Sequence, residues 1–121
     1  MLLLLAGAAV YGQNGGKAEP NRIEFARGSS NKTLTARLSN DEEMEYIFGA
    51  AKGQTVTIRN SNTGLFDVRV FREEANFETE FDSSPVLKFV VPETGDYTFY
   101  VRKKRVKTPK TAAFSVNLAI K

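Results

Sequence analysis

Apolar and polar residues alternate with a period of two along most of the chain after residue 21. The segment 114–120 is the clearest example, because every second residue is large and apolar, and the segment 97–101 has the same pattern. Strict alternation is typical of a β-strand with one buried face and one solvated face. Shorter segments of the same kind precede these two, at 22–27, 34–38, 46–48, 56–58, 66–71 and 87–91.

Residues that favour turns separate these segments. The strongest cluster is 60–64, which reads Asn-Ser-Asn-Thr-Gly, and another lies at 28–32. Pro92 ends the segment before it, because proline cannot donate to a β-ladder. No segment has a helical period, and 73–78 could form one helical turn at most. We therefore expect an all-β fold, a single antiparallel β-sandwich of about seven to nine short strands with a jelly-roll-like arrangement.

The N-terminal residues 1–16 carry no charged side chain and open with an apolar run, 2–5. The run is too short for a membrane-spanning helix, which needs about 20 residues. It is typical of a secretory signal peptide, and a buried N-terminal strand or helix is the alternative. We expect a signal peptide at 1–12, a flexible lead-in at 13–21 and one domain at 22–121. This organisation predicts an exported protein with no membrane anchor in its mature form.

The chain contains no Cys, His or Trp. Disulfide bonds are therefore excluded, and a domain of this size must be stabilised by its packed core. Without His or Cys, the Ser and Cys catalytic triads lack a partner. The carboxylates show no spacing that pairs two of them with confidence, and no glycine-rich phosphate loop occurs. We expect a protein that is not an enzyme and needs no cofactor.

Charge is unevenly distributed along the chain, although 17 basic and 14 acidic residues give a net charge of only +3. The segment 102–110 holds six cations and no acid, whereas 41–45 holds four acids. A polyanion could bind this basic loop, but it lacks the aromatic residues that stack on bases, so we expect no nucleic acid. On charge alone, a solvated hairpin tip is the better interpretation. A calcium site at 41–43 is conceivable, but no ligand spacing supports one.

Four motifs resemble the bacterial pre-peptidase C-terminal type of β-sandwich. They are Tyr-Ile-Phe at 46–48, Ala-Ala-Lys-Gly-Gln at 50–54, Gly-Asp-Tyr at 95–97 and the last alternating strand. Within this group, the chain looks like the periplasmic inhibitors of goose-type (g-type) lysozyme. That similarity extends from Ile23 to Lys121 and includes Glu-Phe-Ala-Arg-Gly-Ser-Ser at 24–30.

The resemblance implies a periplasmic or secreted bacterial inhibitor whose loops enter the substrate cleft of a goose-type lysozyme, which is its expected protein partner. In that family an aromatic residue after the second strand and arginines before the last strand make the contacts. Arg105 occupies one arginine position in the basic hairpin loop 102–110, whereas Asp41 occupies the aromatic position. We expect a monomer or weak dimer whose partner-binding residues are Arg105, Lys103, Lys104, Lys107, Lys110, Asp41 and Glu42.

Two other functions remain open from the sequence. One is a secreted pre-peptidase C-terminal-like module that binds polysaccharide or another protein. The other is a structural subunit with no small ligand. Sandwich folds host many functions, so the fold does not decide among these possibilities.

Overall fold

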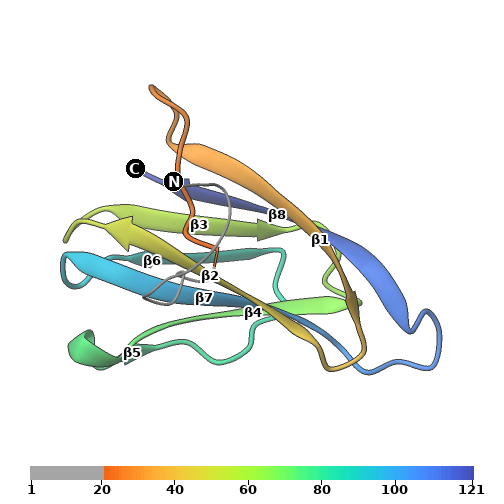
Figure 1. The fold of residues 1–121 in the computed structure, drawn as a ribbon. Helices are drawn as coiled ribbons and strands as arrows, with labels where there is room; N and C mark the ends of the chain where they lie inside the picture. The colour runs from red at the N-terminus through yellow and green to blue at the C-terminus, as the bar shows by residue number, and fades with distance from the viewer. Residues whose placement is uncertain (1–20) are drawn as a thin grey trace, which may run out of the picture.

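Two four-stranded antiparallel sheets pack face to face in the computed structural model, which describes residues 21–121 (Figure 1). The predicted signal peptide and all of the predicted lead-in except Asn21 lie outside the described residues. The strands are β1 (Asn31–Ser39), β2 (Glu43–Ala50), β3 (Thr55–Asn60), β4 (Phe66–Arg72), β5 (Phe77–Glu78), β6 (Val86–Val90), β7 (Gly95–Lys103) and β8 (Thr111–Ile120), with a short 3-10 turn, η1 (Glu73–Ala75).

The strand order is β1-β8-β3-β6 in one sheet and β2-β7-β4-β5 in the other. This is the arrangement of a jelly roll, so the predicted all-β sandwich is confirmed. The segment 22–27 was predicted wrongly as a strand. Only Arg22 forms a bridge, to Ile47, and Ile23 is buried beside it without a ladder of its own.

The core lies between the two sheets and is built from the apolar positions of the alternating segments. Phe66 of β4 meets Phe114 of β8 edge to face, with ring centroids 5.6 Å apart. Burial of each such side chain contributes about 1.5–3 kcal/mol, so a core of this size stabilises the domain without disulfides. The fully or almost fully buried members are Phe48, Val56, Ile58, Phe66, Val68, Val70, Val91, Tyr97, Phe99, Val101, Phe114, Val116 and Leu118.

The predicted hairpin between the last two long strands is wrong in one respect. Strands β7 and β8 belong to different sheets, so the loop between them crosses from one sheet to the other. The strand also extends further than predicted, because Arg102 and Lys103 are part of β7 and the loop proper is 104–110. Consecutive strands lie in opposite sheets in this part of a jelly roll, and alternation along the chain does not reveal that.

The β1–β2 turn (40–42) and the β7–β8 loop (104–110) lie at the same end of the sandwich (Figure 1). Ser39 pairs with Thr111 in one sheet, and Glu43 pairs with Arg102 in the other. Both connections therefore start from adjacent strand ends and run side by side. In the described part of the chain, no helix is long and apolar enough to cross a membrane.

Candidate functional site

Backbone hydrogen bonds join the β1–β2 turn to both ends of the β7–β8 loop. Asn40 donates its N–H to the carbonyl of Lys110 at 2.9 Å, and Asp41 donates to the carbonyl of Lys103 at 3.0 Å. Lys103 in turn donates to the carbonyl of Glu42 at 3.0 Å. The turn thus closes the base of the loop and limits its freedom.

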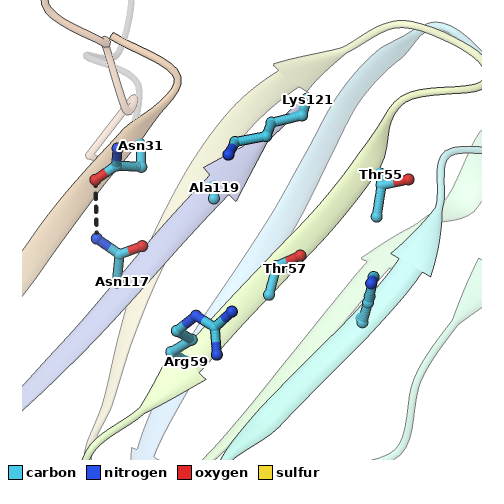
Figure 2. A pocket seen from close by; sticks show the side chains of 8 residues that line it. Asn31, Thr55, Thr57, Arg59, Asn117, Ala119 and Lys121 are labelled. Carbon is cyan, nitrogen blue, oxygen red and sulfur yellow. Dashed lines mark hydrogen bonds between the residues drawn. The ribbon is translucent and has the colours of Figure 1, made fainter.

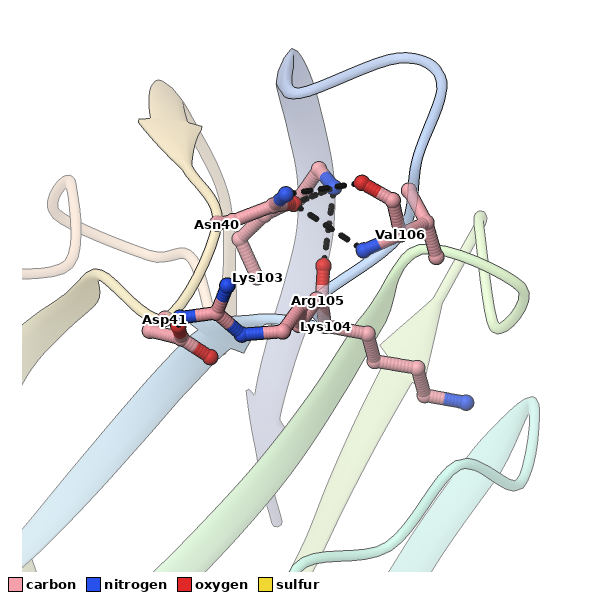
Figure 3. Close-up of polar contacts among 6 residues, drawn as sticks. All are labelled: Asn40, Asp41, Lys103, Lys104, Arg105 and Val106. Atoms are coloured by element: carbon pink, nitrogen blue, oxygen red, sulfur yellow. Dashed lines mark hydrogen bonds and ion pairs between the residues drawn. The ribbon is translucent and has the colours of Figure 1, made fainter.

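The side chain of Asn40 organises the loop from within (Figure 3). Its Oδ1 accepts hydrogen bonds from Lys103 Nζ at 2.8 Å and from the backbone N–H of Val106 at 3.2 Å. Its Nδ2 donates to the carbonyl of Val106 at 2.7 Å. One amide therefore fixes two positions of a connection more than 60 residues away in sequence. No pattern in the sequence distinguishes Asn40, since an Asn-Asp pair indicates only a turn.

Lys103 is a correction to the predicted site. Its side chain is fully buried, because it continues the inward series of Tyr97, Phe99 and Val101. The ammonium group donates to Asn40 and to the carbonyl of Lys104 at 2.9 Å. A buried and internally bonded ammonium cannot contact another protein without local unfolding. The alternation in the sequence already contained this information, but the surrounding cluster of cations obscured it.

Arg105 is exposed and forms an ion pair with Asp41 across the two connections (Figure 3). The side chains are 78% and 54% exposed, respectively, so the pair lies in solvent. Asp41 has a φ of 69°, a left-handed conformation that Asp and Asn tolerate better than bulky residues do. Glu42 is also exposed, but its Oε1 accepts the N–H of Ser39 at 2.7 Å and so helps to fix the turn.

The remaining loop cations differ in their exposure to solvent and in their hydrogen bonds within the protein. Lys104 is half-buried, and its ammonium donates to the carbonyl of Thr63 at 2.9 Å. Lys107 and Lys110 are exposed and form no hydrogen bond through their ammonium groups with any described residue. The loop therefore presents Arg105, Lys107 and Lys110 to solvent.

The conceivable calcium site has no support in the structure. Within residues 21–121, no group of three or more Asp or Glu side chains is placed to hold a metal ion. The buried carboxylate of Asp67, elsewhere in the fold, accepts two hydrogen bonds from Arg102 at 3.2 and 3.0 Å. The β1–β2 turn and the β7–β8 loop thus form a hydrogen-bonded surface with exposed cations at this end of the molecule.

Structural comparison places this arrangement among known proteins. A periplasmic inhibitor of g-type lysozyme from Salmonella Typhimurium, PliG, superposes with a TM-score of 0.69 and 24% identity, over 87% of this chain and 100% of the inhibitor. A mutant of the Escherichia coli inhibitor of g-type lysozyme, PliG-Ec, superposes with a TM-score of 0.67 and 26% identity, over 83% of this chain and 96% of that one.

The chain has the fold of the PliG inhibitors. The pre-peptidase C-terminal domain of a Bacillus anthracis collagenase matches less well, with a TM-score of 0.53 and 18% identity over 89% of this chain and 100% of that domain. Both parts of the resemblance that the motifs predicted are confirmed, and the narrower one gives the better match. No family model and no curated protein matches the chain.

Proposed function

We propose that the protein is an exported inhibitor of a goose-type lysozyme, not an enzyme, and that it acts through the β1–β2 turn and the β7–β8 loop. The likeness to PliG over more than four fifths of the chain is the observation that carries this proposal. The structural neighbours are periplasmic proteins by name, which agrees with the signal peptide predicted at 1–12. Both observations support inhibition in the periplasm or outside the cell.

Arg105 is the proposed anchor. A glycoside hydrolase of the lysozyme kind holds a catalytic carboxyl group in its cleft, and a guanidinium forms charge-assisted, often bidentate bonds with such a group. The loop that carries Arg105 is fixed by Asn40 before any partner arrives. Ordering it on binding therefore costs less conformational entropy than ordering a free loop would.

Asp41 has two roles in this proposal. In the free protein it holds the Arg105 guanidinium over the turn, and an exposed pair of this kind is worth only about 0–1 kcal/mol, so a buried carboxylate of the enzyme can replace it. In the complex, Asp41 and Glu42 face basic groups at the rim of the cleft. Lys107 and Lys110 increase the rate of association with an acidic cleft, whereas Lys103 acts only by supporting the loop from inside.

A lytic assay tests the proposal. The purified protein is titrated against goose-, chicken- and invertebrate-type lysozymes acting on a suspension of bacterial cell walls. We expect stoichiometric inhibition of the goose-type enzyme and much weaker inhibition of the other two. Full lytic activity of all three enzymes at a large molar excess of the protein would contradict the proposal.

A further inference from the structure

The sheet β1-β8-β3-β6 has an outer face with no acidic residue in its strands. None of the four strands contains Asp or Glu, whereas Arg37, Arg59 and Lys88 lie on them with exposed side chains. Lys121, also exposed, directly follows β8. Positive charge on this face therefore has no neutralising neighbour within the sheet.

The strand register brings three of these cations around one groove. Lys88 of β6 pairs with Thr57 of β3, and Arg59 lies two residues further along the same strand. At the other end, Thr55 and Lys121 exchange backbone hydrogen bonds of 2.9 and 3.0 Å. Arg59 and Lys121 are thus separated by about four residues of strand, roughly 13 Å.

The groove itself is open and has a volume of ≈ 490 Å³ (Figure 2). The floor of the groove is mostly polar, because it is formed by short side chains, Thr55 and Thr57 from β3 and Asn117 and Ala119 from β8. Asn117 donates from Nδ2 to Asn31 Oδ1 at 3.2 Å and to Thr33 Oγ1 at 3.1 Å, so its amide is held in one orientation. The lining residues are Asn31, Thr55, Thr57, Arg59, Lys88, Asn117, Ala119 and Lys121.

The three cations of the groove are available for a ligand. Arg59, Lys88 and Lys121 form no side-chain hydrogen bond or ion pair with any residue in the range 21–121. The hydroxyl groups of Thr55 and Thr57 likewise have no partner among the described residues. Unpaired cations beside free hydroxyl groups and the oriented amide of Asn117 match a ligand that carries both anionic groups and hydroxyl groups.

We propose that this groove binds a linear acidic polysaccharide, with Arg59, Lys88 and Lys121 on its anionic groups and Thr57 and Asn117 on its hydroxyl groups. A nucleic acid fits less well, because no aromatic side chain lines the groove to stack on a base. A lipid surface also fits less well, because Ala119 is the only apolar lining residue. Val86 and Val90 are exposed on β6, but neither lines the groove.

The groove is separate from the proposed inhibitory loops. Strand β8 runs from the β7–β8 loop at Thr111 to the groove beyond Asn117, a distance of roughly 20–30 Å along an extended strand. Lysozyme and polysaccharide can therefore be bound at the same time. The proposal goes beyond lysozyme inhibition and does not depend on it.

Binding to polygalacturonate, a linear carboxylated polysaccharide, tests the proposal, with neutral dextran as the uncharged probe. The double variant Arg59→Gln/Lys88→Gln removes two groove cations. The variant Arg37→Gln/Lys107→Gln is the matched control, because it removes the same charge from exposed positions outside the groove. Isothermal titration at low salt gives the dissociation constants, and thermal unfolding verifies that both variants are folded.

We expect polygalacturonate to bind and dextran not to bind. The groove variant is expected to weaken binding at least tenfold, and the control less than threefold. An equal loss of affinity in both variants would overturn the assignment of binding to the groove, because diffuse surface charge would then explain it. Absence of binding, or tighter binding of a single-stranded oligonucleotide or of phosphatidylglycerol vesicles, would overturn the choice of ligand. Lysozyme inhibition by the groove variant is expected to be unchanged, so the two proposals fail separately.

Discussion

The outer faces of the two sheets carry their charges in opposite ways. On β2-β7-β4-β5, cations lie beside acids and rings. Arg102 donates to both oxygens of Asp67 and lies 3.7 Å from the centroid of the Phe81 ring. Arg69 pairs with Glu78 at 2.7 Å. These guanidinium groups are occupied within the molecule and contribute to its stability.

On β1-β8-β3-β6, the cations lie beside uncharged residues. Lys88 pairs with Thr57, and Arg59 pairs with Asn117 and Val86. Arg59 and Lys88 have no acidic neighbour in their sheet and bond to no described side chain. The comparison extends to the basic run 102–110, where three of the six cations, Arg102, Lys103 and Lys104, bond within the molecule. By contrast, the side chains of the three scattered cations of the groove bond to no described residue. The availability of a charge thus depends on its cross-strand neighbours and not on the local density of charge in the sequence.

The largest expected effect concerns Asn40, which bonds to the buried ammonium group of Lys103 and to the β7–β8 loop. In Asn40→Ala, the ammonium of Lys103 loses an acceptor and the backbone of Val106 loses two bonds. Hydrogen bonds to charged groups contribute about 1.5–3 kcal/mol each, so we expect the free energy of unfolding to fall by roughly 2–3 kcal/mol. Urea denaturation measures it. The control, Asn117→Ala in the groove, is expected to cost less than about 1 kcal/mol, and equal losses would contradict the internal role of Asn40.

The next prediction separates binding from stability. Arg105→Ala is expected to weaken lysozyme binding by roughly 2 kcal/mol, about thirtyfold, as a central anchor would. Because Arg105 is 78% exposed, the free energy of unfolding should change by less than about 0.5 kcal/mol. Inhibition titrations and urea denaturation provide the two numbers. Arg27→Ala, an exposed arginine before β1, is the matched control. Unchanged inhibition by Arg105→Ala would remove it from the site.

A third prediction compares the two faces directly. Asp67 is buried and accepts two bonds from Arg102, so Asp67→Ala should lower the free energy of unfolding by about 1–2 kcal/mol. Arg59→Ala on the other face removes no internal partner, so the free energy of unfolding should change by less than about 0.5 kcal/mol. Thermal or urea unfolding at moderate salt measures both. A loss at Arg59 as large as that at Asp67 would mean that Arg59 is also engaged internally.

The smallest expected effect depends on pH. Two hydrogen bonds from Arg22, at 3.0 and 2.8 Å, lower the pKa of Asp96. The positive charges of Arg22 and Arg72 lower this pKa further. A lowered pKa gives stability that is present above the ordinary value for Asp and is lost as the pH falls through the lowered value. Both side chains are partly exposed, so Asp96→Asn should cost only about 0.5 kcal/mol at pH 7.

Denaturation of wild type and Asp96→Asn between pH 7 and pH 2 tests this expectation. The two free energies of unfolding should converge as the pH falls through the lowered pKa of Asp96, because protonation then removes the charge that Arg22 stabilises in the folded state. Glu80→Gln, at an exposed position without an ion pair to a described residue, should show no such convergence. A difference that is constant across the pH range would rule out the charge of Asp96 as its cause.

The sequence alone determined the core of this protein and most of its strands. Period-two alternation is a local property, since successive side chains point to opposite faces, and it identified Phe99, Val116 and Leu118 as buried. The same alternation would also have predicted that Lys103 is buried, if it had been applied to a charged residue. Five short motifs were enough to predict the likeness to the PliG fold.

Only the tertiary structure decided which charges are free. Asp67 and Arg102 are 35 residues apart, Asn40 and Val106 are 66 apart, and the groove combines residues from four strands. These neighbours are set by the jelly-roll order of the strands, which places consecutive strands β7 and β8 in different sheets. Alternation specifies the face on which a residue lies but not the strand beside it. Hydrogen bonds and ion pairs depend on that adjacent strand, because they act over only a few ångströms.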